Sequence, residues 1–128
     1  MRVSELMLRD VTLVPSGDTV QNAARAIADI DSRVILVGAE DRVVGVLTIR
    51  DILIRLVAAG LDPTATPVSQ VMSSSLFTCT EEDDAESVAE RMAEHHIEQM
   101  PVLDAGGRVV GMITRRAAET LPSPGPPQ

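Results

Sequence analysis

Aromatic residues are almost missing from this chain of 128 residues. It contains one phenylalanine, no tryptophan and no tyrosine. A hydrophobic core must therefore be built from aliphatic side chains and methionine. Hydrophobic residues make up 45% of the sequence, which is enough for a packed interior and excludes an intrinsically disordered protein.

Cysteine is equally rare, since Cys79 is the only one. An internal disulfide is therefore excluded, and the apolar neighbours of Cys79 favour a small buried hydrophobe over a reactive thiol. No apolar run approaches the roughly 20 residues that span a bilayer. Residues 1–10, "MRVSELMLRD", include no apolar stretch typical of a secretory signal. We expect a cytoplasmic protein.

Positive charge is scarce as well. All 11 basic residues are arginine, against 19 acidic residues, and the formal net charge is −8. Residues 67–128 hold 4 arginines and 10 acids, a balance of −6, so most of the acidity lies in the second half. An acidic surface repels phosphate backbones and anionic lipids, which argues against nucleic-acid or membrane binding. A few arginines could still hold a small anion.

Residue patterns typical of catalysis or metal binding are also missing. The sequence has no Ser/His/Asp or Cys/His arrangement with a supporting spacing, and no Gly-rich phosphate loop. His95 and His96 are adjacent, so on a helix they point about 100° apart and cannot both face one metal ion. The acidic run 81–86 could hold a divalent cation, but it is more typical of a solvated helix N-terminus. We predict no enzyme, no catalytic residue and no metal site.

The chain does contain an internal repeat. The sequence "VSELM" (Val3–Met7) recurs as "VSQVM" (Val68–Met72), and we call each of these segments, together with the residue that follows it, a lead-in. The sequence "RVVGVLTIRD" (Arg42–Asp51) recurs as "RVVGMITRRA" (Arg108–Ala117). Copies of about 60 residues are too small to fold well alone, so we expect a pseudo-twofold pair.

Both copies predict the same order of elements, because their apolar spacing alternates in the same way between helical and strand-like patterns. Asp18 or Thr19 can cap the first long helix. The predicted elements of the first copy are a helical turn at 3–7, an extended segment at 11–14, a helix over 20–28, a hairpin of strands 34–37 and 42–47, and a helix over 48–60.

The second copy repeats this order, with a predicted strand at 75–79, a helix over 85–93, strands at 100–103 and 108–113, and a short helix. The arrangement resembles a tandem pair of cystathionine-β-synthase (CBS) domains, called a Bateman module. The resemblance rests on "GVLTIRD", "GMITRRA", the hairpin "QMPVLDAGGRVVG" and the lead-in "VSQVM", and it covers residues 3–121. Small stand-alone bacterial CBS-pair proteins have a similar linker.

The resemblance implies an α/β fold of two pseudo-twofold-related β-α-β-β-α repeats packed through their sheets. The expected division is a first repeat with its linker at 1–66 and a second repeat at 67–121. The tail 122–128 is rich in proline, and we expect it to be disordered.

The family binds adenosine-containing ligands in clefts between the two repeats. The resemblance thus implies a regulatory module that binds AMP, ADP, ATP or S-adenosylmethionine as a regulatory ligand, with no cofactor. Carried over to this chain, the first cleft would be formed by Val46, Thr48, Arg50, Asp51, Leu76, Phe77, Ile97 and Gln99, and a weaker second cleft by Val11, Thr12, Asp31, Arg33, Met112, Thr114, Arg115 and Arg116.

One position separates the two copies, because Asp51 of the first copy is Ala117 in the second. A carboxylate suits a ribose, since it can accept hydrogen bonds from both hydroxyl groups. It also suits a capping box with Thr48 at a helix start. The second copy begins an equivalent helix without the carboxylate, which favours the ligand role and weakens the second cleft.

Two functions therefore stay open. The first is a nucleotide-sensing module that acts on a regulated protein, and the alternative is a degenerate pair that binds no nucleotide and serves as a dimeric interaction scaffold. Arg33, Arg115 and Arg116 could hold phosphate or could simply balance an acidic surface. The helix after Thr48 is apolar nearly all round, so we expect a second copy of the chain to cover part of it in a homodimer.

Overall fold

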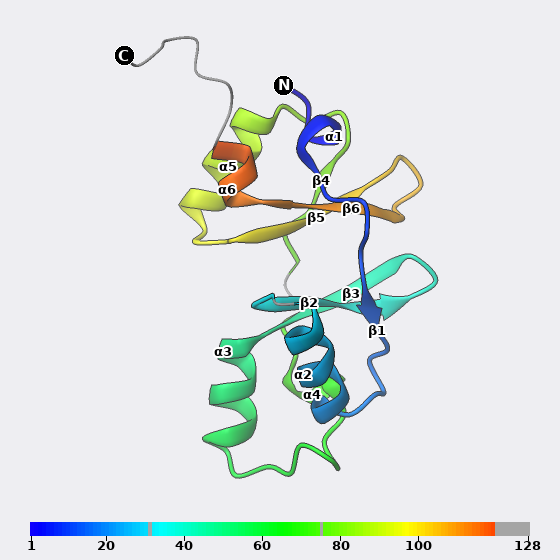
Figure 1. The fold of residues 1–128 in the computed structure, drawn as a ribbon, viewed down its shortest axis with the longest axis vertical. Helices are drawn as coiled ribbons and strands as arrows, with labels where there is room; N and C mark the ends of the chain where they lie inside the picture. Colours follow the sequence, from blue (N-terminus) through cyan, green and yellow to red (C-terminus); the bar gives the residue numbers. More distant parts are fainter. Residues whose placement is uncertain (31, 75, 120–128) are drawn as a thin grey trace. The chain divides into compact units, whose positions relative to one another are not determined.

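The chain forms two compact units, each built around a three-stranded sheet (Figure 1). The computed structural model describes residues 1–30, 32–74 and 76–119. One unit is Thr12–Leu76, and the other combines Met1–Val11 with the chain from Phe77 onward. The predicted α/β class is confirmed. The tail expected at 122–128 lies outside the described residues.

In the unit Thr12–Leu76, the helix after the first turn begins where the sequence predicts. The hydroxyl of Thr19 accepts a hydrogen bond from the amide of Asn22, and the face that carries Val20, Ala23 and Ile27 is buried. The elements are β1 (Leu13–Val14), α2 (Val20–Asp29), β2 (Val34–Ala39), β3 (Arg42–Thr48), α3 (Ile49–Asp51), the π-helix η1 (Ile52–Val57) and α4 (Val68–Val71).

The sheet of this unit has the order β1-β2-β3, with β1 parallel and β3 antiparallel to β2. Figure 1 shows α2 against one face of this sheet. The predicted hairpin is confirmed: Ala39 pairs with Arg42, and Glu40 and Asp41 between them both have positive φ, at 55° and 63°. A two-residue turn with this backbone matches the twist of the strands it joins.

The second unit has the same topology, with sheet order β4-β5-β6. The strand predicted at 75–79 is wrong in its bounds, because the strand begins only at Cys79. Pairing with the parallel neighbour covers Cys79 and Thr80 alone, and Phe77 lies outside it with 39% of its surface exposed. The elements are α1 (Val3–Leu6), β4 (Cys79–Thr80), α5 (Ala85–Glu94), β5 (Gln99–Leu103), β6 (Val109–Thr114) and α6 (Arg115–Glu119).

Each lead-in packs on the other repeat. Val3 and Met7 lie in the core formed with α5, β5 and β6, while Val68 and Val71 lie in the core formed with α2, β2 and β3. The compact units therefore do not coincide with the repeats divided at 66 and 67. The repeats follow the order of the chain, whereas the compact units follow the burial of the apolar lead-in residues.

Backbone pairing fixes each lead-in to the last strand of its unit. Ser73 exchanges two hydrogen bonds of 2.9 Å with Val46 on β3, and Leu8 exchanges two of 2.8 Å with Met112 on β6. The glycine next to each strand residue makes room for this pairing. A Cβ atom on Gly45 would come within 2.8 Å of the carbonyl oxygen of Ser73. A Cβ atom on Gly111 would come within 2.7 Å of that of Leu8.

The lone cysteine is part of the core. Cys79 is 3% exposed, and its Sγ atom lies 3.8 Å from the carbonyl oxygen of Pro101. Burial raises the pKa of the Cys79 thiol to about 12, and the Asp83 carboxylate acts in the same direction. The interpretation of this residue as a small buried hydrophobe is confirmed.

The raised pKa of Cys79 predicts a loss of stability in alkali. The unfolded thiol ionises near pH 9, whereas the folded one keeps its proton to about pH 12, so the unfolded state binds fewer protons between these values. The free energy of unfolding should be unaffected by this group below pH 9 and should fall by about 2–3 kcal/mol by pH 11. The chain has no lysine or tyrosine to titrate in the same window.

Urea unfolding of wild type and Cys79→Ala at pH 8 to 11 measures this effect. The variant should start less stable, because it leaves a cavity, and should lose much less stability with rising pH. Parallel slopes for the two proteins would contradict the assignment.

Candidate functional site

The helix start after β3 is closed by a reciprocal pair of hydrogen bonds. The amide of Asp51 donates to Thr48 Oγ1 and the amide of Thr48 donates to Asp51 Oδ2, both at 3.0 Å. This is the capping box that the sequence offered as one explanation of "TIRD". It uses one oxygen of the carboxylate. Among the hydrogen bonds of the described residues, none reaches the other oxygen, Oδ1, of this half-buried side chain.

The equivalent helix of the second copy forms without a carboxylate. The amide of Ala117 donates to Thr114 Oγ1 at 3.1 Å, and the amide of Arg115 donates to the carbonyl oxygen of Glu98 at 2.8 Å. The start of α6 is therefore capped by the Thr114 hydroxyl, without a carboxylate at position 117. By the same geometry, the helix after Thr48 does not require Asp51, although the carboxylate adds one hydrogen bond to its start.

The predicted phosphate-binding arginines fall into two groups. The Arg115 guanidinium already lies between two carboxylates, with Nε 3.0 Å from Glu119 and Nη1 3.4 Å from Glu98. An anion at Arg115 would have to compete with these two carboxylates. By contrast, Arg33, Arg50 and Arg116 are exposed, and within the described residues their guanidinium groups make no ion pair.

Each predicted cleft takes residues from both compact units, so its two halves are described separately. Asp31 lies outside the described residues. The unit Thr12–Leu76 contains the predicted residues Thr12, Arg33, Val46, Thr48, Arg50, Asp51 and Leu76, and the other unit contains Val11, Phe77, Ile97, Gln99, Met112, Thr114, Arg115 and Arg116.

Within each unit, the structure brings two of the predicted residues together at one end of the sheet. The amide of Ile49 donates to the carbonyl oxygen of Arg33 at 3.1 Å, so Arg33 lies beside the capped helix start at Thr48. In the other unit Gln99 is the register partner of Thr114. Each of these sheet ends thus joins a residue of the predicted first cleft to one of the second.

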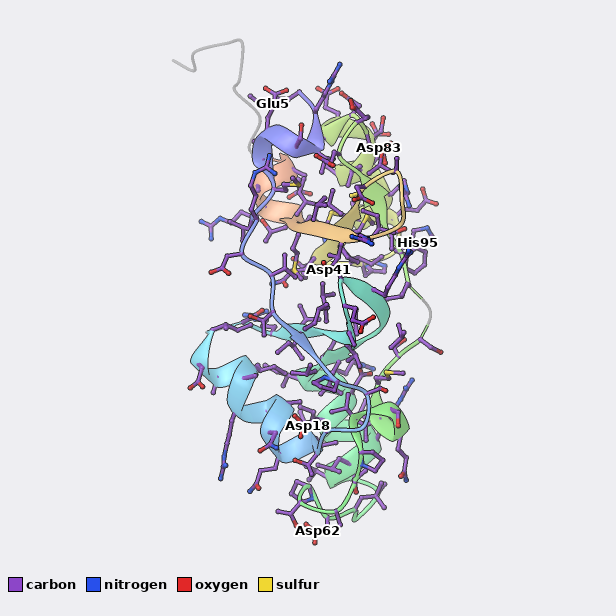
Figure 2. The ribbon with its side chains drawn as sticks, turned by 90° about the vertical axis from the view of Figure 1, so that its right-hand side faces the viewer. Glu5, Asp18, Asp41, Asp62, Asp83 and His95 are labelled. Carbon is purple, nitrogen blue, oxygen red and sulfur yellow. The ribbon has the colours of Figure 1, made fainter. Side chains whose placement is uncertain are left out.

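The side chain of Phe77 is not isolated. Its ring stacks on the imidazole of His95, with 4.5 Å between the ring centroids and 29° between the planes (His95 is labelled in Figure 2). The Arg91 guanidinium donates to the carbonyl oxygen of Thr78 at 3.0 Å. The sequence interpretation considered His95 only as a metal ligand and did not single out Arg91. Their spacing of four residues, which places both on one helix face, was the available signal.

Two further properties bear on the class of site. In residues 1–30, 32–74 and 76–119, no three His, Cys, Asp or Glu side chains come together where they could hold a metal ion. The helices in this same part of the chain are all too short or too polar to cross a membrane.

Comparison with known proteins identifies the fold family. The family model described as "CBS domain" matches residues 3–58 and 68–118. YhcV of Bacillus subtilis, a CBS domain-containing protein, is 33% identical over 87% of this chain and 78% of its own length. Hypoxic response protein 1 of Mycobacterium tuberculosis is 31% identical over 86% of this chain and 77% of that protein. Protein MK0525 of Methanopyrus kandleri is 27% identical, and the chain spans 58% of its length.

Solved structures agree with this result. Hypoxic Response Protein I, crystallised with two coordinated zinc ions, superposes with a TM-score of 0.85 at 29% identity, over 95% of this chain and all of that one. Protein MJ1225 of Methanocaldococcus jannaschii, proposed as an archaeal homologue of γ-AMPK, gives 0.81 at 25% identity, over 91% of this chain and 46% of that one. With both repeats matched by the family model, this chain belongs to the CBS domain family.

Proposed function

We propose that this CBS pair is a regulatory module that binds one adenosine-containing nucleotide (AMP, ADP, ATP or S-adenosylmethionine) through Thr48 and Asp51. The observation that carries the proposal is that the two oxygens of the Asp51 carboxylate differ in their hydrogen bonds. Oδ2 caps the helix, while Oδ1 makes no hydrogen bond to the described residues, and the twin helix forms with no carboxylate at all. A carboxylate that the helix does not need is available to a ligand.

The residues around the helix start at Thr48 suit a ribose phosphate. A carboxylate oxygen with two lone pairs can accept hydrogen bonds from neighbouring ribose hydroxyls, and such charge-assisted bonds are the stronger kind. The guanidinium groups of Arg33 and Arg50, exposed and without ion pairs in the described chain, supply positive charge for a phosphate. The family resemblance puts the base against Phe77 and Ile97.

The second set of residues is less suited to the same ligand. Ala117 has no carboxylate, and Arg115 is held by Glu98 and Glu119. We therefore propose one nucleotide per chain. The competing function is an interaction scaffold that binds no nucleotide. It would follow if the Asp51 carboxylate only caps the helix, because both predicted clefts would then be empty.

We also propose that a second copy of the chain covers the helix after Thr48. Leu56 on this helix is buried, but four large apolar side chains are not. An isolated chain rarely leaves so much contiguous apolar surface in water. The exposed fractions are 44% for Ile49, 55% for Leu53, 52% for Ile54 and 62% for Val57.

Replacing the carboxylate by an amide separates capping from binding. In Asp51→Asn, the side-chain oxygen can still accept the hydrogen bond from the Thr48 amide, so the helix start should be kept. The charge is lost, and hydrogen bonds to charged groups contribute about 1.5–3 kcal/mol. Affinity for the bound nucleotide should therefore fall roughly 10- to 150-fold by calorimetry, while the thermal midpoint without nucleotide changes little.

Equal affinity in wild type and Asp51→Asn would show that the carboxylate is only a helix cap. Thermal-shift measurements on wild type with AMP, ADP, ATP and S-adenosylmethionine decide between the two functions. A ligand at 100 times its dissociation constant adds about 2.7 kcal/mol of stability, so the absence of any shift at millimolar concentrations would favour the scaffold.

The dimer is tested by charging the exposed helix face. One chain has a mass of 13.6 kDa. Light scattering at tens of micromolar should give twice this mass for wild type. Leu53→Glu combined with Val57→Glu should give the single-chain mass, because two carboxylates would be buried in the interface. The matched control is Ile30→Glu, which charges another exposed apolar residue (46% exposed) outside this helix. A monomeric wild type, or equal masses for all variants, would contradict the proposal.

A further inference from the structure

The only phenylalanine of the protein contacts a histidine that the predicted site does not include. We infer that His95 positions the Phe77 ring so that it offers one face to the adenine base of an adenosine-containing ligand. The inference rests on the proposed function and adds to it a positioning residue for base recognition.

Helix α5 holds the segment before β4 through two side chains one turn apart. Arg91 donates to the carbonyl oxygen of Thr78, and His95 stacks on Phe77, so residues four apart on the helix contact consecutive residues of the segment. The backbone of His95 is held at the end of the helix. Its amide donates to the carbonyl oxygen of Arg91 at 3.1 Å, and His96 then turns the chain with a φ of 57°.

This stack leaves Phe77 with one ring face for a ligand. The imidazole covers the other face at a centroid distance of 4.5 Å, yet 39% of the residue is exposed. A ligand that stacks on Phe77 would therefore use the face opposite the imidazole. A base that stacks there would extend the pair to three rings, an arrangement open to any purine because every base has a π-face.

A second predicted base contact, Ile97, is fixed at the same end of α5. Ile97 follows the turn at His96, is half-buried, and packs against the core of this unit. Its amide donates to the carbonyl oxygen of Met92 at 2.8 Å, which fixes its place at the end of α5. Phe77 and Ile97 are thus both anchored to the last turn of one helix, and both are predicted base contacts.

A simpler role for His95 is to anchor the segment before β4 without any effect on the ligand. Two probes separate the roles: AMP, which has a base, and ribose 5-phosphate, which has none. The variants are His95→Ala, which removes the stack, His95→Phe, which restores a ring, and the control His96→Asn, which alters the neighbouring imidazole and tolerates the positive φ.

The expected result is a loss that depends on the base. His95→Ala should bind AMP roughly three- to tenfold more weakly than wild type, His95→Phe should recover most of this loss, and His96→Asn should match wild type. Affinity for ribose 5-phosphate should be the same in all four proteins. A loss of equal size for both probes, or no loss for AMP, would overturn the inference.

A second readout uses the composition of the chain. With one phenylalanine and no tyrosine or tryptophan, the Phe77 ring protons are the only aromatic signals besides those of the two histidines in an NMR spectrum. AMP should shift them in wild type. If AMP binds without moving these signals, the inference fails and the proposed function stands. If none of the four adenosine ligands binds to wild type, the proposed function fails and the inference with it.

Discussion

The backbone pairing between each lead-in and the last strand of the opposite repeat is the constraint on which the structure depends. Ser73 pairs with Val46, and Leu8 pairs with Met112, in both cases through two hydrogen bonds. A glycine beside each strand residue is required, because any larger residue would collide with the carbonyl oxygen of the lead-in. The pairing adds an isolated bridge beside each sheet, and buried valines of the lead-ins lie in the cores, Val3 in one and Val68 and Val71 in the other. Neither repeat therefore has a complete core from its own residues.

The same pairing places the candidate site. Val46 is paired on β3 only two residues before Thr48, so the strand that ends in the capping box is held at its edge. The chain that forms this edge then leaves the unit after Leu76, and Phe77 follows at once in the other unit. Helix α5 holds Phe77 there through His95. The strand before Thr48 and Asp51 is thus held by the lead-in pairing, whereas Phe77 is held by its contact with α5.

Local features of the sequence predicted the fold well. The hairpin at Glu40 and Asp41, the helix cap at Thr19 and the paired Thr48 and Asp51 depend on residues within a few positions of one another, so their spacing was sufficient evidence. The repeat supplied the rest, because it required the second half to copy the topology of the first.

Features that depend on distant residues could not be predicted in this way. The lead-ins are similar in sequence, and no neighbouring residue in the sequence indicates that each one is buried in the core of the other repeat. The strand at Cys79 was expected to be longer, because an apolar run does not reveal where its parallel partner ends. The π-helical hydrogen bonds, such as that from Ala58 to Leu53, have a wider spacing than the apolar pattern suggests. The two clefts combine residues of both units and remain a prediction.

The central claim is that the Asp51 carboxylate makes a ligand site that Ala117 lacks. Calorimetry that counts AMP molecules bound per chain, in wild type and in Ala117→Asp, tests it most directly. The substitution supplies a carboxylate beside Thr114, where the amide of residue 117 already donates to the hydroxyl. The account predicts one AMP per chain in wild type and a second in Ala117→Asp. Two AMP bound to wild type without the added carboxylate, no second AMP in Ala117→Asp, or no binding of any of the four adenosine ligands to wild type would contradict it.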